Sequence, residues 1–219
     1  MSERKIKIAV MVSGGGTNLQ ALIDAQEAGI IRSGQISLVI SNKVGAYALE
    51  RAKNAGIESV TVTKKKPSAG SRSTDDNVIY CDSQEDFEAQ IVCLIKQHSI
   101  DLIVLAGFMS ILSEGFTTLF ANRIINVHPA LIPSFCGKGY YGLKVHEAAL
   151  KYGVKVTGAT VHFVNEVPDG GRIIAQKAVD VVEGDTPETL QRRVMEQAEW
   201  IILPVSTEKV CRQIIEGVL

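Results

Sequence analysis

Short hydrophobic runs alternate with amphipathic segments along most of this chain. The runs expected to form strands are residues 6–12, 36–40, 60–62, 102–106, 123–127, 154–164 and 172–182. The segments with hydrophobic residues at helical spacing are 18–28, 46–55, 87–97, 113–120, 143–151 and 187–217. Nearly continuous hydrophobic runs are typical of strands covered on both faces. The pattern therefore predicts an α/β fold: a Rossmann-like, mostly parallel sheet with helices on both faces and a long C-terminal helix.

Two segments depart from this regular alternation. Residues 63–79 contain a run of lysines among Pro, Gly and Ser, and we expect them to be irregular. The helix over 187–217 is expected to be kinked or interrupted at Pro204, because proline lacks the N–H donor that a helix interior needs. Since no repeat or linker-like stretch divides the chain, residues 1–219 are predicted to form a single domain.

Composition narrows the class of protein. Lys plus Arg total 23 and Asp plus Glu total 24, so the net charge of -1 does not favour a nucleic-acid or acidic-lipid partner. The four cysteines form no Cys-x-x-Cys pair, which indicates reduced thiols and no zinc site. No hydrophobic stretch resembles a signal peptide or a membrane span. We therefore expect a soluble, cytoplasmic protein without a metal, either a monomer or a homodimer.

The first candidate for chemistry is a pair of polar residues at the end of the strand over 123–127. Pro129 should end this strand, and residues two apart in a strand point to the same side, so Asn126 and His128 should project together. Open α/β sheets keep their ligand crevice at this carboxyl end. An amide can donate to a developing oxyanion, and an imidazole can move a proton near neutral pH. The equally weighted alternative is a buried Asn that caps a turn beside a core histidine.

The second candidate is the glycine-rich turn after the first strand, Ser13-Gly14-Gly15-Gly16-Thr17-Asn18-Leu19. Glycines permit close approach of the backbone, and the N–H groups that begin the next helix favour an anion such as phosphate. The third glycine of a dinucleotide fingerprint and its acidic partner are missing, as is the Gly-Lys-Ser/Thr of a Walker loop. The turn fits a single phosphate better than NAD or ATP, or it serves only close packing between strand and helix.

The third candidate is Asp169, in the turn between the last two predicted strands. Asp-Gly-Gly is an ordinary turn sequence, so a plain hairpin is the simpler interpretation. A carboxylate there could instead orient His128 or share a proton with it. On the preceding strand Thr160 and His162 lie on one face, so Thr160 is available to a polar site as a supporting residue. His162, like the other two histidines, is interpreted as packing or surface.

Five motifs occur together in the order found in one known family. They are Ser13–Leu19, Ser41-Asn42-Lys43, Leu105-Ala-Gly-Phe-Met-Ser-Ile-Leu112, Asn126-Val-His-Pro-Ala-Leu-Ile-Pro133 and Thr157-Gly-Ala-Thr-Val-His-Phe163, and the spacing to Asp169-Gly170-Gly171 also fits. Over essentially its whole length the chain resembles the phosphoribosylglycinamide formyltransferases, folate-dependent enzymes of purine biosynthesis. The resemblance implies transfer of a formyl group from 10-formyltetrahydrofolate to the amine of glycinamide ribonucleotide (GAR), without a metal or a nucleic-acid or membrane partner.

The resemblance also assigns residues to roles. Asn126, His128 and Asp169 match the family's catalytic trio, in which Asn126 and a protonated His128 would stabilise the oxyanion. Gly16, Thr17, Asn18 and Glu199 match positions that bind the ribonucleotide. Residues that match the folate pocket are Leu105, Met109, Ser110, Ile111, Leu112, Val164, Asn165, Glu166, Val167 and Pro168. On this basis residues 1–100 form mainly the ribonucleotide half and 101–219 the catalytic and folate half.

One position of this chain differs from the residue found in some members of the family, and three other classes of protein are alternative interpretations. Gln84 stands where some members have an arginine that supports phosphate binding. Formyltetrahydrofolate hydrolase shares the trio but carries an added N-terminal regulatory domain, and methionyl-tRNA formyltransferase carries an added C-terminal RNA-binding domain; neither addition is expected in this chain. A non-catalytic phosphosugar-binding protein would keep the glycine turn but would not need the trio.

Overall fold

The structure is a computed structural model that describes residues 4–64 and 77–219. It is built on one eight-stranded sheet with the strand order β4-β3-β2-β1-β5-β6-β7-β8. The strands from β4 to β6 are parallel, and β7 and β8 continue the sheet in antiparallel fashion. The strands are β1 (Ile6–Val12), β2 (Gly34–Ser41), β3 (Ser59–Thr63), β4 (Val78–Tyr80), β5 (Leu102–Leu105), β6 (Ile124–His128), β7 (Val156–Phe163) and β8 (Ile173–Asp180).

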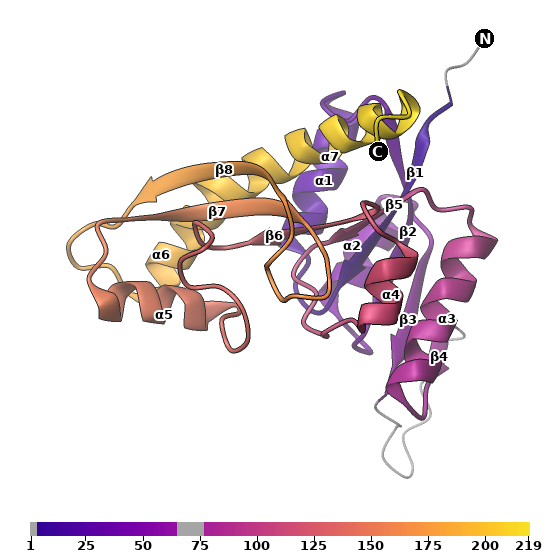
Figure 1. The fold of residues 1–219 in the computed structure, drawn as a ribbon, viewed down its shortest axis with the longest axis horizontal. Coiled ribbons are helices and arrows are strands. Elements are labelled where there is room, and N and C mark those ends of the chain that lie inside the picture. Colours follow the sequence, from indigo (N-terminus) through magenta and orange to yellow (C-terminus); the bar gives the residue numbers. More distant parts are fainter. Residues whose placement is uncertain (1–3, 65–76) are drawn as a thin grey trace.

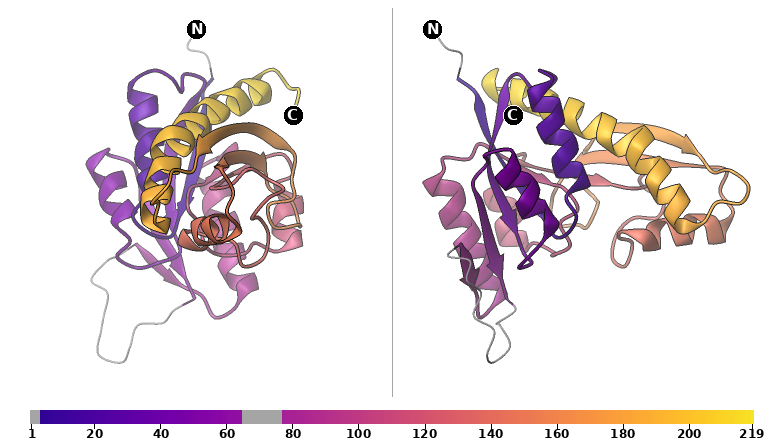
Figure 2. Two further views of the ribbon diagram at one scale, coloured as in Figure 1. Left: turned by 90° about the vertical axis from the view of Figure 1, so that its left-hand side faces the viewer. Right: turned by 180° about the vertical axis from the view of Figure 1, so that it is seen from behind.

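Helices cover both faces of the sheet, as the continuous hydrophobic strands require. They are α1 (Thr17–Glu27), α2 (Tyr47–Asn54), α3 (Gln84–Gln97), α4 (Glu114–Leu119), α5 (Leu143–Tyr152), α6 (Pro187–Val194), a π-helical turn η1 (Met195–Glu199) and α7 (Trp200–Ile215). In Figures 1 and 2, α1, α2 and α7 lie against one face of the parallel strands and α3 and α4 against the other. The predicted fold class is therefore confirmed.

The two faces of the sheet have separate hydrophobic cores. Leu19 of α1, Ala48 of α2 and Leu203 of α7 belong to one core, together with one set of alternating strand residues. Phe87 of α3 and Phe116 of α4 belong to the other, with the opposite set. The β7–β8 hairpin extends beyond the parallel strands, beside α5, α6 and α7 (Figure 1). This layered packing fixes the position of each loop that leaves a strand.

The topology identifies where a ligand site should lie. The order of the strands reverses between β1 and β5, since β2, β3 and β4 lie on one side of β1 and β5 to β8 on the other. At such a switch point the loops that leave the carboxyl ends of the strands separate and open a crevice. Here these loops are the glycine turn after β1 and residues 106–113 after β5. A hydrogen bond of 2.7 Å from the Met109 N–H to Ser13 Oγ joins them.

Two local predictions need correction. The strand β4 falls partly within residues 63–79, which we expected to be irregular; the remainder of that prediction lies largely outside the described residues. The final helical segment is interrupted at the π turn over 195–199, and α7 runs through Pro204 without ending there. Proline at the fifth position of α7 removes only the N–H that would reach the carbonyl of Trp200, at the start of that helix.

No helix among residues 4–64 and 77–219 has both the length and the apolar character needed to cross a membrane.

Candidate active site

The strand β6 carries Asn126 and His128 to the carboxyl edge of the sheet, side by side as the alternation of a strand predicts. Asn126 is half-buried and His128 is buried. The neighbouring strand β7 runs antiparallel, with His162 directly opposite Asn126 and Thr160 directly opposite His128. The two β6 side chains therefore share one surface with polar residues of β7.

Asp169 reaches this surface from the loop between β7 and β8. Its backbone has φ 57°, a left-handed conformation that Asp tolerates better than most residues. Gly171 is required two residues later, because a Cβ there would overlap the carbonyl oxygen of Phe163. The Asp169 Oδ2 atom lies 3.5 Å from Nδ1 of His128 and accepts a hydrogen bond of 2.8 Å from the Gly137 N–H. The structure thus brings together all three residues of the predicted trio.

Both ring nitrogens of His128 face protein groups. Its Nε2 lies 2.8 Å from the carbonyl oxygen of Phe135, and since a carbonyl only accepts, Nε2 carries a hydrogen. Burial lowers the pKa of His128 and outweighs the opposing effects of Asp169 and of the Phe135 carbonyl, so the net shift is downward. At neutral pH the ring is therefore neutral, with its unprotonated Nδ1 toward Asp169. The expectation of a protonated His128 that stabilises the oxyanion needs correction, because burial disfavours the charged ring.

For Asp169, in contrast to His128, neighbouring groups outweigh the effect of burial on the pKa. Burial raises the pKa of its carboxyl, but a proton on the His162 or His128 ring and the Gly137 N–H favour the carboxylate, and the net shift is downward. Asp169 is thus ionised at neutral pH beside a neutral imidazole. A proton released in the crevice can be held between Asp169 Oδ2 and His128 Nδ1, where either atom accepts it.

His162 is the residue that sequence reasoning missed. Its Nε2 lies 3.2 Å from Nδ2 of Asn126 and 3.6 Å from Oδ1 of Asp169, so it touches two members of the trio. The available signal was its position on the same face of β7 as Thr160. That signal needed the register between β6 and β7, which places His162 opposite Asn126.

Thr160 supports the segment that follows β6. Its hydroxyl donates to the Ala130 carbonyl at 2.7 Å and accepts from the Ile132 N–H at 3.1 Å and from Gln176 at 3.0 Å. The side chain is completely buried. Its contacts therefore hold residues 130–132, next to His128, in a fixed path.

The glycine turn joins β1 to α1 on the other side of the switch point. Gly16 has φ 70°, and a Cβ there would lie 2.6 Å from Cβ of Ala48, so only glycine fits. The Arg51 Nε donates to the Gly15 carbonyl at 2.8 Å and supports the turn from α2. Thr17 and Asn18 begin α1, where backbone N–H groups have no intrahelical partner and favour an anion.

Glu199 meets the start of α1 although it lies near the other end of the chain. Asn18 Nδ2 donates a 2.6 Å hydrogen bond to Glu199 Oε2. The wide π turn over 195–199 carries this glutamate, and such turns are frequent at functional sites. Burial raises the pKa of Glu199 to about 7. Three of the predicted ribonucleotide positions, Thr17, Asn18 and Glu199, therefore lie together.

The raised pKa predicts how Glu199→Gln changes stability with pH. The folded state holds the proton more tightly than the unfolded state, so the wild-type protein loses stability as the pH rises from about 4.5, the ordinary value, to about 7. Glutamine mimics the protonated acid. We expect the variant to be more stable above pH 7, by on the order of 3 kcal/mol for a shift of this size, with no difference below about pH 4.5.

Chemical denaturation of both proteins across this pH range measures the difference. The buried His146, whose pKa is lowered to about 4, has the opposite pH dependence in both proteins and cancels in the comparison. Glu196→Gln, an exposed change on the same π turn, is the matched control and should show no such trend. A constant difference between wild type and Glu199→Gln at all pH values would contradict the raised pKa.

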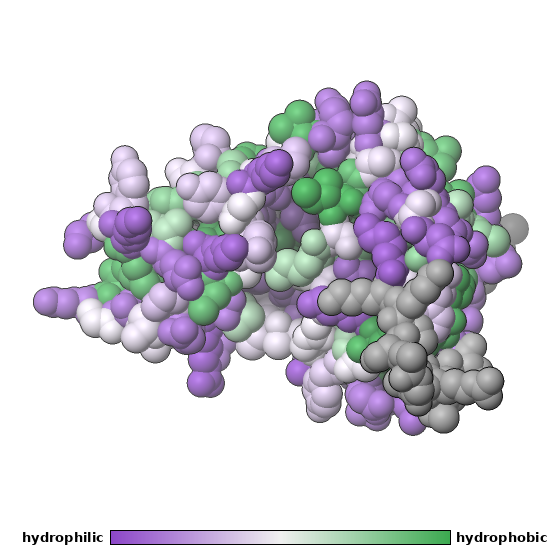
Figure 3. All heavy atoms as spheres, turned by 90° about the horizontal axis from the view of Figure 1, so that it is seen from below, coloured by the Kyte–Doolittle hydropathy of each residue, from purple (hydrophilic) through white to green (hydrophobic). Residues whose placement is uncertain are grey.

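The predicted folate residues form two neighbouring loops. Leu105, Leu112 and Val164 pack in one hydrophobic core, which joins the loop after β5 to the loop after β7. Met109 and Ile111 are 50% and 68% exposed and are free to meet a ligand, whereas Ser110 is held by a hydrogen bond from Asn42. On the face shown in Figure 3, hydrophobic side chains form several separate patches among hydrophilic ones. The remaining predicted residues, 165–168, follow Val164 in the β7–β8 loop.

Gln84 lies on this folate side of the site. Its amide donates to the Ile111 carbonyl at 3.2 Å and to Glu88 at 2.7 Å, and it accepts from Lys64 at 2.5 Å. The described contacts of Gln84 are therefore with Lys64, with the loop after β5 and with its own helix.

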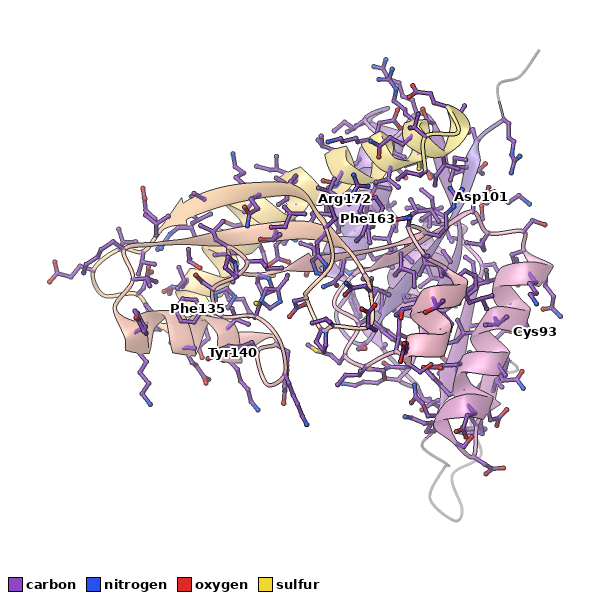
Figure 4. All side chains as sticks on the ribbon, viewed as in Figure 1. Cys93, Asp101, Phe135, Tyr140, Phe163 and Arg172 are labelled. Atoms are coloured by element: carbon purple, nitrogen blue, oxygen red, sulfur yellow. The ribbon has the colours of Figure 1, made fainter. Side chains whose placement is uncertain are left out.

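Two ring contacts lie near the site, one at the end of β7 and one in the segment between β6 and α5. The Arg172 guanidinium lies 4.8 Å from the centre of the Phe163 ring, and Phe135 packs edge-on to Tyr140 in front of α5 (Figure 4). No group of three or more His, Cys, Asp and Glu within the described part of the chain is arranged to hold a metal ion. Among these residues, acid–base and hydrogen-bonding groups are what the crevice offers.

The fold and site define an α/β protein with a Rossmann-like sheet and an amide–imidazole–carboxylate site of the kind used in acyl transfer. The chain belongs to the formyl transferase family, whose pattern matches residues 6–206. It is 41% identical to phosphoribosylglycinamide formyltransferase of Haemophilus influenzae, over 91% of this chain and 84% of that protein. It is 36% identical to the chloroplastic phosphoribosylglycinamide formyltransferase of Arabidopsis thaliana, over 92% of this chain and 64% of that protein.

Structural comparison gives the same family. The crystal structure of glycinamide ribonucleotide transformylase 1 from Symbiobacterium toebii matches with a TM-score of 0.80 and 38% identity, over 99% of this chain and 94% of that one. The chain spans less than two thirds of the length of the plant and animal relatives that it matches.

Proposed function

We propose that this protein transfers the formyl group of 10-formyltetrahydrofolate to the amine of GAR, giving N-formyl-GAR and tetrahydrofolate in purine biosynthesis. The observation that carries the proposal is the meeting of Asn126, His128 and Asp169 in the crevice at the switch point of the sheet. The glycine turn before α1 and the exposed Met109 and Ile111 lie on two loops that are joined at this switch point. These are the groups that a phosphorylated amine and a folate need.

The reaction requires one new bond, one broken bond and one transferred proton. The GAR amine attacks the formyl carbon, and the carbonyl oxygen becomes an oxyanion to which an Asn126 N–H donates. The amine proton passes to the pair formed by ionised Asp169 and neutral His128. Collapse of the tetrahedral intermediate breaks the bond between the formyl carbon and the folate nitrogen, and that nitrogen takes the proton.

Each substrate has its own part of the crevice in this proposal. The N–H groups of Gly16, Thr17 and Asn18 bind the ribonucleotide phosphate together with the Thr17 hydroxyl, which turns to it from Met195 Sδ, 3.8 Å away. Glu199 accepts from a ribose hydroxyl. Leu105, Met109, Ile111 and Leu112 contact the pterin ring, with 164–168 closing the pocket beside it. No metal takes part in this scheme, since the folate nitrogen already makes the formyl group transferable.

The test is an assay of the purified protein with 10-formyltetrahydrofolate, with and without GAR. Formation of tetrahydrofolate and N-formyl-GAR in equal amounts, only when both substrates are present, is the expected result. Tetrahydrofolate formed at the same rate without the amine would indicate a hydrolase, and binding without turnover would indicate a phosphosugar-binding protein. Either result would overturn the proposal.

The phosphate turn gives a separate prediction for Thr17→Val. Removing a hydroxyl at the predicted phosphate site is expected to raise the KM for GAR about tenfold or more, because a hydrogen bond to a charged group contributes about 1.5–3 kcal/mol. The KM for the folate should stay unchanged. Thr118→Val, on the exposed surface of α4, is the matched control. A selective rise in the folate KM would mean that the two subsites are reversed.

The location of the protein in the cytoplasm and its state as a monomer or homodimer stay predictions from the sequence.

A further inference from the structure

His162 occupies a place in the site that the proposed reaction does not yet use. The ring is 1% exposed and lies directly opposite Asn126 in the pairing of β6 with β7. Its Nε2 faces the Asn126 amide nitrogen at 3.2 Å, and its Nδ1 faces the carbonyl oxygen of Phe163 at 2.7 Å. Both ring nitrogens therefore have defined partners.

These partners determine which nitrogen of the ring carries the hydrogen. A carbonyl oxygen only accepts hydrogen bonds, so Nδ1 of His162 must be the donor to Phe163. In the neutral ring the other nitrogen, Nε2, then has only a lone pair. The Asn126 amide group must present its NH₂ side to that lone pair, because its oxygen has no hydrogen to donate. The Phe163 carbonyl thus fixes the orientation of Asn126 through His162.

We propose that His162 is a positioning residue for formyl transfer, which accepts one N–H of Asn126 so that the second N–H points toward the forming oxyanion. This inference rests on the proposed function. The oxygen and the NH₂ group of an amide side chain have nearly the same size and shape. Packing alone therefore does not decide which of its two orientations the amide adopts. With the amide reversed, its oxygen would face the oxyanion and repel it.

Asp169 does not take the place of Asn126 as the partner of His162. The distance from Nε2 to Asp169 Oδ1 is 3.6 Å, longer than the 3.2 Å to Asn126 and beyond a hydrogen bond. His128 does not donate to the oxyanion in place of Asn126, because its Nε2–H donates to the Phe135 carbonyl. The orientation of one amide therefore decides whether the oxyanion meets a donor.

Two substitutions of His162 separate positioning from packing. Asparagine places its amide nitrogen near the position of Nδ1 and keeps the donor to Phe163, but it has no acceptor in reach of Asn126. Glutamine is longer and places an acceptor near the position of Nε2. We expect His162→Asn to lower kcat by about 100-fold, the loss typical of a missing oxyanion donor, with both KM values within about threefold of wild type, since substrate contacts are unchanged. His162→Gln should recover most of the lost kcat.

A double-mutant cycle with Asn126→Ala shows whether His162 acts through Asn126. Without the amide there is nothing to orient, so adding His162→Asn to Asn126→Ala should lower kcat by less than about threefold, because coupled residues are not additive. An equal loss in both backgrounds would overturn the inference. So would a low kcat in His162→Gln equal to that of His162→Asn when both proteins melt like wild type.

A measurement on the unsubstituted protein covers the case in which the variants do not fold. Nitrogen-15 NMR of histidine-labelled protein at pH 8 should show His162 with its hydrogen on Nδ1 and a bare Nε2. A hydrogen on Nε2 would overturn the inference. This result does not depend on turnover, so failure of the formyl-transfer assay and failure of the positioning role are distinguishable.

Discussion

His128→Asn is expected to lower kcat by about three orders of magnitude, within the range of about 10²–10⁴ that a positioned proton acceptor contributes. Asparagine is polar and fits the space of the ring, but it cannot take a proton. The Nδ1 atom of His128 lies 3.5 Å from Asp169 Oδ2, so the substitution leaves the carboxylate as the sole acceptor in this pair. Steady-state assays with both substrates measure the effect.

The fold should survive this change, because the hydrophobic cores on both sides of β6 are untouched. Circular dichroism and a melting curve at neutral pH serve as the check. His98→Asn is the matched control, since that histidine lies beside Glu58 at the end of α3. A folded His128→Asn protein with a kcat near wild type would exclude the imidazole from proton transfer.

Asp169→Asn is expected to lower kcat by a similar factor, about 10²–10⁴, with small changes in both KM values. The amide oxygen can still accept from the Gly137 N–H, so the loop between β7 and β8 should keep its path. What is lost is the negative charge that receives the amine proton together with His128. Asp180→Asn, an exposed change on β8, is the control and should leave kcat unchanged.

The pH profile of Asp169→Asn gives a second, independent result. In the wild-type protein the charge of Asp169 raises the pKa of His128 and partly offsets the lowering caused by burial. Removing that charge should lower the pKa of His128 further. Because the reaction needs the neutral ring, activity falls as the pH drops through this pKa, and the acidic limb should move to lower pH in the variant. A shift to higher pH would contradict the assigned charges.

Much of the fold was predictable because it depends on neighbours in the sequence. The continuous hydrophobic runs at 6–12 and 102–106 became the central strands β1 and β5, with β5 ending one residue earlier, at Leu105. The strand predicted over 123–127 is shifted by one residue, to 124–128, so that it includes His128, and its alternation placed Asn126 and His128 on one side. The start of α3 was predicted three residues too late, at Phe87, because the hydrophobic spacing begins there, whereas the Ser83 side chain caps a helix that begins at Gln84.

Features with a weak local signal were missed or misplaced. The strand β4 has only three residues and depends on pairing with β3 for its existence. The π turn over 195–199 has no hydrophobic period of its own, so the sequence pattern predicted the irregularity at Pro204 instead. In both cases the deciding contacts are with another part of the chain.

The sequence by itself determined the layers of the fold, the phosphate-type turn and the pairing of Asn126 with His128, since each follows from residues a few positions apart. Tertiary structure alone decided which distant groups meet them. Asn18 and Glu199 are 181 positions apart, and Asn126 and His162 are 36 apart, yet each pair is hydrogen-bonded. Strand order and register set these meetings. Burial then shifted the pKa values of His128 and Glu199, and neighbouring groups outweighed burial at Asp169.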